Sequence, residues 1–376
     1  MKYELLLITV VFILTFSGCG SEQTEQIPDE PVEDAEFALE LVITDSIGVE
    51  LGDSNYVFGS IEASSHTAEG NILVLDRPAC CVREYTPDGI FVGSFGRRGS
   101  GPGEFYNPLS MVRLNDGRVA IFDMQAGGMS VFLADGEWEG IATDIFREPV
   151  MWLTAADSNR YVGTINSFEI VDDQPILTAY VGKFEIDETE PSLIYWENSF
   201  VFDFSNSSQI VEEAYFAKTW ASDRDGNVFI ASRDTEEYLI SGFDVNGEEF
   251  VEISMDLPAV QKSEEEIAEE AEFWNQRAKN MGYGGQLNYQ PDPYRWKIHS
   301  MGIDSENRLW VRRGTEDTPT FDVFGYDGKH IFNACIPSVI GTDGLLWEVH
   351  VDEFGILAWS LNPLDGYQKL YTLELQ

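Results

Sequence analysis

Four arginines are the side chains of this sequence best suited to recognising an anion. They form two adjacent pairs, Arg97 with Arg98 and Arg312 with Arg313, in a chain that has 66 Asp and Glu residues but only 23 Lys and Arg residues. A guanidinium group can bind a carboxylate or a phosphate through two parallel hydrogen bonds. The four arginines are therefore candidates for a binding face. The alternative is that they neutralise part of the surrounding negative charge.

The histidines do not have the spacing of a metal site. His66, His299 and His350 lie 4, 8 and 5 residues before the turn that follows each of them. Catalytic zinc needs ligands that converge on one point, so these unequal spacings predict no histidine-based metal site. Acid pairs are too numerous to single one out, and the chain has neither a Gly-x-Ser-x-Gly elbow nor a glycine-rich loop that leads into a helix. The sequence therefore assigns no catalytic residue, no metal ligand and no cofactor.

Cysteine offers a further possible chemistry. Cys80 and Cys81 are adjacent, and Cys335 makes an odd number of thiols once Cys19 is set aside. Adjacent side chains of a strand point to opposite faces, so we expect two packed thiols at 80 and 81. A strained vicinal disulfide or a soft-metal contact is the alternative.

The segment at about 260–295 is predicted to be an insertion with a helix of its own. Ser263 and Glu266 form a capping box, in which each side chain bonds a free N–H at the helix start. Apolar residues then recur at helical spacing as far as Asn280. Aromatic residues make the insertion a candidate lid or partner-binding ridge. They are Trp274, Tyr283, Tyr294 and Trp296. The alternative is a helix that only packs on the body of the protein.

The rest of the chain repeats one plan of four strands. Segments such as 116–123 (DGRVAIFD) and 225–232 (DGNVFIAS) join a turn to an alternating apolar strand, which is the pattern of a β-hairpin. A second Asp-Gly or Asn-Gly turn follows in most units, and we expect type I′ turns with positive φ at both central residues. Six units of about 50 residues predict an all-β, six-bladed β-propeller with four antiparallel strands in each blade.

Two parts of this plan are irregular. Residues 145–197 lack the glycine turns, although 158–165 and 176–187 fit as the middle strands of that unit. The last unit supplies only three strands before the chain ends, and 37–44 (FALELVIT) is the first strand-like run of the body. We expect 37–44 to pair with 367–375 and close the ring, because this pairing would cover two sheet edges.

Residues 93–136 carry the most specific motif, which begins GSFGRRGSGPGEFYNP and continues through Asp116-Gly117. In these positions the chain resembles an NHL-type repeat, and residues 37–376 as a whole resemble the six-bladed β-propeller lipoproteins of bacteria. The resemblance implies the fold and a surface location but no activity. In such a propeller, the four arginines would approach the same end of the ring. Related propellers include lyases and lactonases that hold a metal over the central channel.

The N-terminus carries a predicted targeting signal. Residues 1–18 form a signal peptide, because the apolar run Leu5–Phe16 would give a helix of about 18 Å, too short for the roughly 30 Å core of a bilayer. The run ends in FSGC, which resembles a bacterial lipobox and implies lipidation of Cys19. Ordinary secretion is the alternative. Residues 19–36 are rich in acids and form a flexible tether. Gly20 implies an outer-membrane or cell-surface lipoprotein.

The net charge of −43 limits the partners of this protein. It argues against nucleic acid, and against an anionic membrane surface except through the lipid anchor. The spread of acids along the whole body also predicts adaptation to salty surroundings. We expect a monomeric, non-catalytic binding or scaffolding lipoprotein whose ligand is a protein, a peptide or a glycan. A metal-dependent hydrolase or lyase, as the related propellers imply, is the alternative.

Overall fold

The computed structural model describes residues 39–123, 128–143, 152–203, 209, 211–280, 289–339 and 346–376. The chain divides into two compact units, Met1–Glu36 and Phe37–Gln376, and every described residue belongs to the second unit. The predicted signal peptide, Cys19 and the tether therefore lie outside the described residues. Within those residues, no helix combines the length and hydrophobicity needed to cross a membrane.

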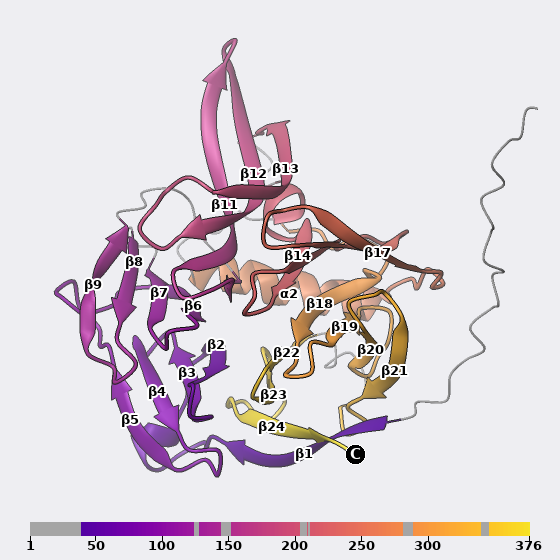
Figure 1. Cartoon of the computed structure of the whole chain (residues 1–376). Helices are drawn as coiled ribbons and strands as arrows, with labels where there is room; N and C mark the ends of the chain where they lie inside the picture. Colours follow the sequence, from indigo (N-terminus) through magenta and orange to yellow (C-terminus); the bar gives the residue numbers. More distant parts are fainter. Residues whose placement is uncertain are drawn as a thin grey trace, which may run out of the picture. The chain divides into compact units, whose positions relative to one another are not determined.

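The second unit has an all-β, propeller-like fold (Figure 1). Four of its sheets each contain four strands that follow one another in the chain. The first sheet contains β2 (Ile61–His66), β3 (Ile72–Asp76), β4 (Cys81–Tyr85) and β5 (Phe91–Phe95). The second contains β6 (Pro108–Arg113), β7 (Val119–Asp123), β8 (Gly128–Phe132) and β9 (Trp138–Thr143). The third contains β10 (Thr154–Ala155), β11 (Arg160–Val171), β12 (Gln174–Glu185) and β13 (Leu193–Val201). The fourth contains β14 (Lys218–Ser222), β15 (Val228–Ser232), β16 (Tyr238–Phe243) and β17 (Glu249–Met255).

The fifth sheet has eight strands in the order β18-β19-β20-β21-β1-β24-β23-β22. One half is β18 (Ile298–Ile303), β19 (Leu309–Arg313), β20 (Thr320–Phe324) and β21 (His330–Cys335). The other half is β1 (Leu39–Ile47), β24 (Leu370–Leu375), β23 (Gly355–Ser360) and β22 (Trp347–Asp352). β1 pairs with β24 in antiparallel register, and only Leu39 and Glu40 pair with β21, in parallel. The N-terminal strand therefore meets the last strand of the chain, as the sequence predicted.

The Asp-Gly turns differ from the predicted type I′ geometry. At the tip between β4 and β5, Gly89 has a φ of 73°, and its N–H donates to the Thr86 carbonyl at 2.8 Å. Asp88 is not among the residues with positive φ. This is a type I turn followed by a left-handed glycine, and the strand register shifts between Glu84 and Tyr85 just before it. This loop is longer than a two-residue type I′ turn and needs positive φ at only one position, which glycine occupies.

The third sheet departs most from the others, as its weak repeat predicted. β11 and β12 have 12 residues each and pair without a break from Arg160 with Glu185 to Val171 with Gln174. Their hairpin extends beyond the rest of the sheets (Figure 1). Asp172 and Asp173 at its tip both have positive φ, 50° and 62°, so the predicted type I′ geometry occurs in the unit that lacks glycine turns.

The core lies between neighbouring sheets. One cluster joins Leu73 and Leu75 of β3 to Met111 of β6 and Ile121 of β7. Strands β3 and β7 are buried along their whole length because a sheet covers each of their faces. Each innermost strand also contacts the innermost strand of the next unit. These contacts join β2 with β6, β6 with β10, β10 with β14, β14 with β18, β18 with β22, and β22 with β2.

One long helix interrupts the strands. α2 (Glu264–Asn280) begins and ends where the sequence predicted, and it lies behind the inner strands in Figure 1. The capping box is confirmed, because the Glu266 N–H donates to Ser263 Oγ at 3.1 Å and the Ser263 N–H donates to the Glu266 carboxylate at 2.8 Å. The described residues also include the 3-10 helix η1 (Ser54–Tyr56) and the π-helix η2 (Val211–Tyr215).

Candidate functional site

A cleft of about 1390 Å³ lies between α2 and the loops at the end of the sheets where β2 and β22 begin. α2 forms one wall with Glu269, Glu272, Phe273 and Gln276. These residues follow one another at helical spacing, so their side chains share one face of the helix. Arg277 of α2 also lines the cleft, so this wall carries two carboxylates, one guanidinium group and a single aromatic ring.

The opposite wall of the cleft comes from loops of three sheets. It combines aromatic rings, side-chain amides and one exposed arginine, namely Phe58, Tyr106, Asn107, Arg98, Asn362 and Tyr367. Arg98 donates to the Pro78 carbonyl at 2.9 Å, and its guanidinium group lies 5.8 Å from the centre of the Tyr106 ring. Aromatic surface with a few convergent polar groups is the usual composition of a ligand site.

A buried carboxylate holds the second half of α2 against the sheets. Glu62 on β2 pairs with Arg277 of α2, and it also lies 3.4 Å from the guanidinium group of Arg77. The Glu62 side chain is only 4% exposed. Burial lowers the pKa of Arg77, and the charge of Glu62 opposes that shift. The ion pair joins residues that are 215 positions apart in the sequence.

A second ion pair fixes the first turn of α2. Arg295 lies 2.5 Å from the Glu266 carboxylate, and both side chains are buried. Burial alone would raise the pKa of Glu266, but hydrogen bonds from the Ser263 N–H and from Arg295 outweigh it and hold the pKa below its usual value. The start of α2 is therefore tied to the segment that leads into β18.

A small cavity of about 70 Å³ lies between α2 and the inner strands, next to the cleft. The two spaces share the lining residues Glu269, Leu346 and Leu361, so the cavity adjoins the inner side of the cleft. Trp274 of α2 and Trp296 line the cavity. We call the cleft and this inner cavity together the α2 site.

Glu348 on β22 faces the inner cavity. Among the described residues, none donates a hydrogen bond to its carboxylate or pairs with it as an ion. The guanidinium groups of Arg312, Arg233 and Arg277 interact with it electrostatically. Burial raises the pKa of Glu348, and these positive charges oppose the rise. A carboxyl with a raised pKa that lines a cavity is typical of a functional site.

Two arginines near Glu348 are shielded from water, the partly buried Arg233 and the fully buried Arg312. The guanidinium group of Arg233 lies within 6 Å of the ring centres of Trp152, Phe216 and Trp296, and its Nε–H donates to the His299 carbonyl at 3.0 Å. Burial lowers the pKa of Arg233 to about 10.

Arg312 is 2% exposed, and burial lowers its pKa to about 10 as well. It donates to the Trp347 carbonyl and lies 3.4 Å from Nδ1 of His299. Since arginine only donates, Nδ1 of His299 is the acceptor, and the proton of the neutral ring is on Nε2. His299 also lines the inner cavity.

The structure does not bring the four predicted arginines into one group. Arg98 lines the cleft, whereas the exposed Arg97 pairs with Glu104 at 2.7 Å. Arg312 is buried beside Trp347, as described above, and Arg313 is bound by Asp322 through two hydrogen bonds of 2.9 and 2.7 Å. Adjacent side chains of β19 point to opposite faces, which separates the last two.

The predicted aromatic residues of the insertion divide in a similar way. Trp274 and Trp296 line the inner cavity, and Tyr294 is 41% exposed without lining either space. Tyr283 lies outside the described residues.

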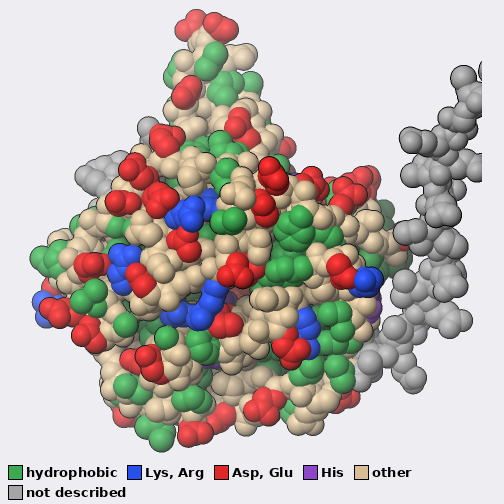
Figure 2. Space-filling view, viewed as in Figure 1, with side chains coloured by type: hydrophobic (Ala, Val, Ile, Leu, Met, Phe, Trp, Pro, Cys, Tyr) green, Lys and Arg blue, Asp and Glu red, His purple; other side chains and the backbone are tan. Residues whose placement is uncertain are grey.

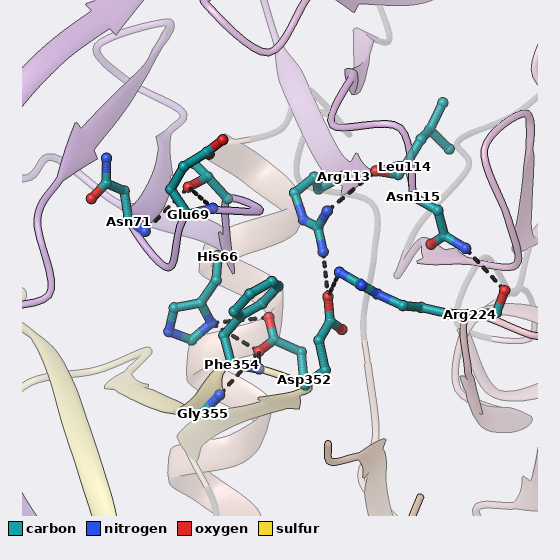
Figure 3. A network of polar contacts seen from close by, with 12 residues as sticks. His66, Glu69, Asn71, Arg113, Leu114, Asn115, Arg224, Asp352, Phe354 and Gly355 are labelled. Carbon is teal, nitrogen blue, oxygen red and sulfur yellow. Dashed lines mark hydrogen bonds and ion pairs between the residues drawn. The ribbon is translucent and has the colours of Figure 1, made fainter. Parts of the chain in front are cut away.

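Two histidines meet at the other end of the inner strands, whereas the prediction from their spacing was that the three histidines would not converge on one metal ion. His66 Nδ1 lies 2.9 Å from the Asp352 carboxylate, and His350 Nε2 lies 3.2 Å from it (Figure 3 shows His66 and Asp352). Burial alone would raise the pKa of Asp352, but the hydrogen bonds from both histidines hold it well below its usual value. His299 lies apart, beside Arg312. In the described residues, no group of three His, Cys, Asp or Glu side chains has a geometry that could hold a metal ion.

The histidines have a charged neighbour at this end. Glu353 forms ion pairs with both Arg113 and Arg224, and the Phe354 ring lies under both guanidinium groups (Figure 3). Glu62 and His66 lie near opposite ends of β2, four residues or about 13 Å apart. This network is therefore separate from the α2 site. Figure 2 shows acids spread over one face of the molecule, with Lys and Arg side chains near its middle.

The cysteines carry no disulfide in the described part of the chain. Cys80 and Cys335 are buried, and Cys81 is partly buried. Burial raises the pKa of all three thiols. Cys80 has a φ of 55°, at the turn into β4, so it does not share the strand geometry that the sequence suggested for the adjacent pair.

Glu62 and Glu348 were not singled out from the sequence, although a signal was present for Glu348. In the run WEVHVD of β22, the odd positions are buried and the even positions are partly exposed. This alternation places Glu348, His350 and Asp352 on the face of the strand that looks into the ring. The alternation of charged and apolar residues along this strand is therefore the sequence signal that points to Glu348.

No family model and no curated protein sequence matches this chain. Among solved structures, it is similar to a protein of Bacteroides fragilis assigned as exported, with 16% identity, a TM-score of 0.46, and coverage of 90% of this chain and 95% of that one. A virginiamycin B lyase of Staphylococcus aureus has 9% identity, a TM-score of 0.43 and 90% coverage of both chains. A gluconolactonase of Xanthomonas campestris has 11% identity, a TM-score of 0.43, and coverage of 88% and 98%. At such low identity, function has to be inferred from this chain's own residues.

Proposed function

We propose that this protein is a propeller lipoprotein of the bacterial cell envelope that binds a ligand at the α2 site without transforming it. The ligand classes are a protein, a peptide or a glycan. The observation that carries the proposal is the cleft of about 1390 Å³, whose walls bring aromatic rings, amides and charges together from α2 and three sheets.

The proposal includes six blades. The eight-stranded sheet would count as two blades, because its halves join only where Leu39 and Glu40 pair with β21. The six innermost strands also contact one another in a closed sequence. β1 would then complete the last blade and remove its free edge.

The proposal also includes a lipid anchor at Cys19 and a tether of residues 19–36. The supporting feature is the sequence FSGC at the end of an apolar run. A Cys19→Ala variant should leave the membrane fraction of the producing cells. If that variant still partitions with membranes, the anchor is not a lipid on Cys19.

A binding screen tests the function of the α2 site. The purified body of the chain would be applied to arrays of glycans and peptides, and hits would be measured by calorimetry. Glu272→Trp places a bulky ring in the cleft, whereas Glu265→Trp changes an exposed residue of the same helix that lines neither space. We expect the first variant to weaken binding at least tenfold and the second to leave it unchanged. A ligand that binds all three proteins equally would place the site elsewhere.

The alternative is a hydrolase or lyase, with metal dependence as the sequence suggested. The observation that favours an enzyme is the raised pKa of Glu348, a carboxyl that lines the same cavity as His299. Metal analysis of protein purified without chelators tests the metal-dependent form. One divalent ion per chain would support the enzyme over the binding protein.

A further inference from the structure

The α2 wall of the cleft carries two carboxylates that have no partner of their own. Glu269 and Glu272 line the cleft, and among the described residues neither forms an ion pair or accepts a hydrogen bond. They are three residues apart in α2, a spacing that places their Cβ atoms about 5–6 Å apart on one face of the helix. Phe273 lies beside them and is partly exposed. A cationic side chain can meet both carboxylates there and cover the ring with its aliphatic stem.

The arginines of the cleft do not cancel its negative charge. Arg77 and Arg277 share one carboxylate, that of Glu62. Arg98 lies on the opposite wall and has no ion-pair partner among the described residues, and the same is true of a third acid of the lining, Glu50. With Glu62 included, four carboxylates face three guanidinium groups in the described lining. A ligand that carries both signs, with its positive group at α2 and its negative group at Arg98, matches this arrangement.

The charge of the whole protein favours the positive group of such a ligand. A net charge of −43 attracts a cation and opposes the approach of a ligand that is only anionic. The inner cavity suits the positive group less well than the cleft does, because Arg233, Arg277 and Arg312 already interact electrostatically with its carboxylate Glu348. The positive group is therefore expected on the cleft side of α2.

The size and the polar groups of the cleft favour a peptide over a small amine. Pockets of about 300–1000 Å³ hold a drug-sized ligand, and this cleft has about 1390 Å³. Asn362 lines it, and the exposed side-chain amide of Asn362 has no hydrogen-bond partner among the described residues. This amide has one acceptor oxygen and an N–H donor, as a peptide group does, so the two can pair through two hydrogen bonds. Tyr106 and Tyr367 supply aromatic surface for other side chains of the same segment.

We infer that the cleft of the α2 site binds an extended peptide segment that carries both a basic and an acidic side chain. A lysine or arginine of the segment lies against Glu269 and Glu272, and a carboxylate of the same segment lies at Arg98. This inference rests on the proposed binding function and selects the peptide from its three ligand classes. It also predicts that added salt weakens binding, because both contacts are between opposite charges.

Peptide selection on the full chain tests this inference. A random peptide library displayed on phage would be panned against the wild type, and the selected peptides would be synthesised and titrated by calorimetry. We expect sequences enriched in Lys or Arg together with Asp or Glu. Their affinity should fall about tenfold in the double variant Glu269→Gln/Glu272→Gln, which loses two charged acceptors. The matched control Glu264→Gln/Glu265→Gln removes the same charge from exposed residues of α2 that line neither space, and it should stay within about twofold of wild type because distant charges are screened.

Changes in the peptide identify which contact each variant removes. Replacing the basic residue of the peptide with Gln should weaken binding to the wild type about tenfold and should have little further effect in E269Q/E272Q, because the two changes remove the same contact. Arg98→Gln should weaken binding of the parent peptide without altering the effect of the basic residue. Unchanged affinity in R98Q would show that no carboxylate of the segment lies at Arg98.

Other outcomes overturn the inference in distinguishable ways. It fails if the selected peptides are not enriched in basic residues, or if E269Q/E272Q binds them as tightly as E264Q/E265Q while melting curves show both variants folded. If a glycan binds and no peptide does, and Glu272→Trp abolishes that binding, the proposed function stands and the peptide assignment fails. If neither a peptide nor a glycan binds, both proposals fail.

Discussion

Replacing Glu62 with Gln tests how α2 is held over the inner strands. The Glu62 carboxylate pairs with Arg277 of α2 and with Arg77, and the three side chains are 4%, 15% and 12% exposed. In the described residues, Arg77 and Arg277 form no other ion pair. The substitution therefore leaves two partly buried guanidinium groups without an ion-pair partner.

The magnitude follows from this burial. Removing one partner of a buried ion pair costs about 3–5 kcal/mol, and the partial exposure of both arginines favours the lower end of that range. For a body of this size, about 3 kcal/mol corresponds to a fall in melting temperature of roughly 4 °C. Arg277→Met should cost less, about 1–2 kcal/mol, because Glu62 keeps Arg77 as its partner.

Urea unfolding of the two single variants and the double variant measures the coupling directly. We expect a coupling free energy of about 1–3 kcal/mol between Glu62 and Arg277. Lys279→Met, an exposed change on the same helix, is the control and should stay within about 0.5 kcal/mol of wild type. A coupling below about 0.5 kcal/mol would refute the idea that this ion pair holds α2 in place.

Three other predictions follow from the structure. Deleting Leu39–Ile47 (β1) should expose the edge of β24 and give an aggregated protein on size-exclusion chromatography, whereas a soluble deletion that melts cooperatively would contradict ring closure. Raising NaCl to about 1 M shortens the Debye length to about 3 Å, so the melting temperature should rise as the self-repulsion of a charge of −43 is screened, and a flat or falling response would count against it. Because the pKa of Glu348 is raised in the folded state, the folded protein binds more protons than the unfolded chain above the usual carboxyl range. The stability of wild type relative to E348Q should therefore increase as the pH falls from 7 toward that range, and a difference that does not depend on pH would show that burial does not shift this group.

Much of the fold follows from local patterns in the sequence. The second strands, such as β7 and β15, lie where an alternating apolar run follows a turn dipeptide. α2 begins at its capping box and ends at Asn280. These features depend on residues within one or two turns of each other, and the sequence contains all of them. The turn at Gly89 differs from the predicted type, because an Asp-Gly pair fits both a two-residue and a longer hairpin loop.

The α2 site and the separate histidine network at Asp352 depend on contacts that no local pattern specifies. Arg277 meets Glu62 across 215 positions, and His66 meets Asp352 across 286. These contacts depend on how deep the first strand of each unit lies in the ring. Packing between neighbouring sheets sets that depth. The number of residues between a side chain and the next turn does not reveal this depth, because bulges shift the register of strands such as β2 and β18.

The sequence by itself therefore determined the strands, the turns, the helix and the acidic character of this protein. Only the tertiary structure decided which charged residues face the ring, which are buried between sheets, and which line a cavity. Arg312 and Arg313 show the reason. They are adjacent in one strand, yet one is buried beside Trp347 and the other is bound by Asp322 inside its own sheet. A strand fixes that neighbouring side chains diverge, but the surrounding sheets fix what each side chain meets.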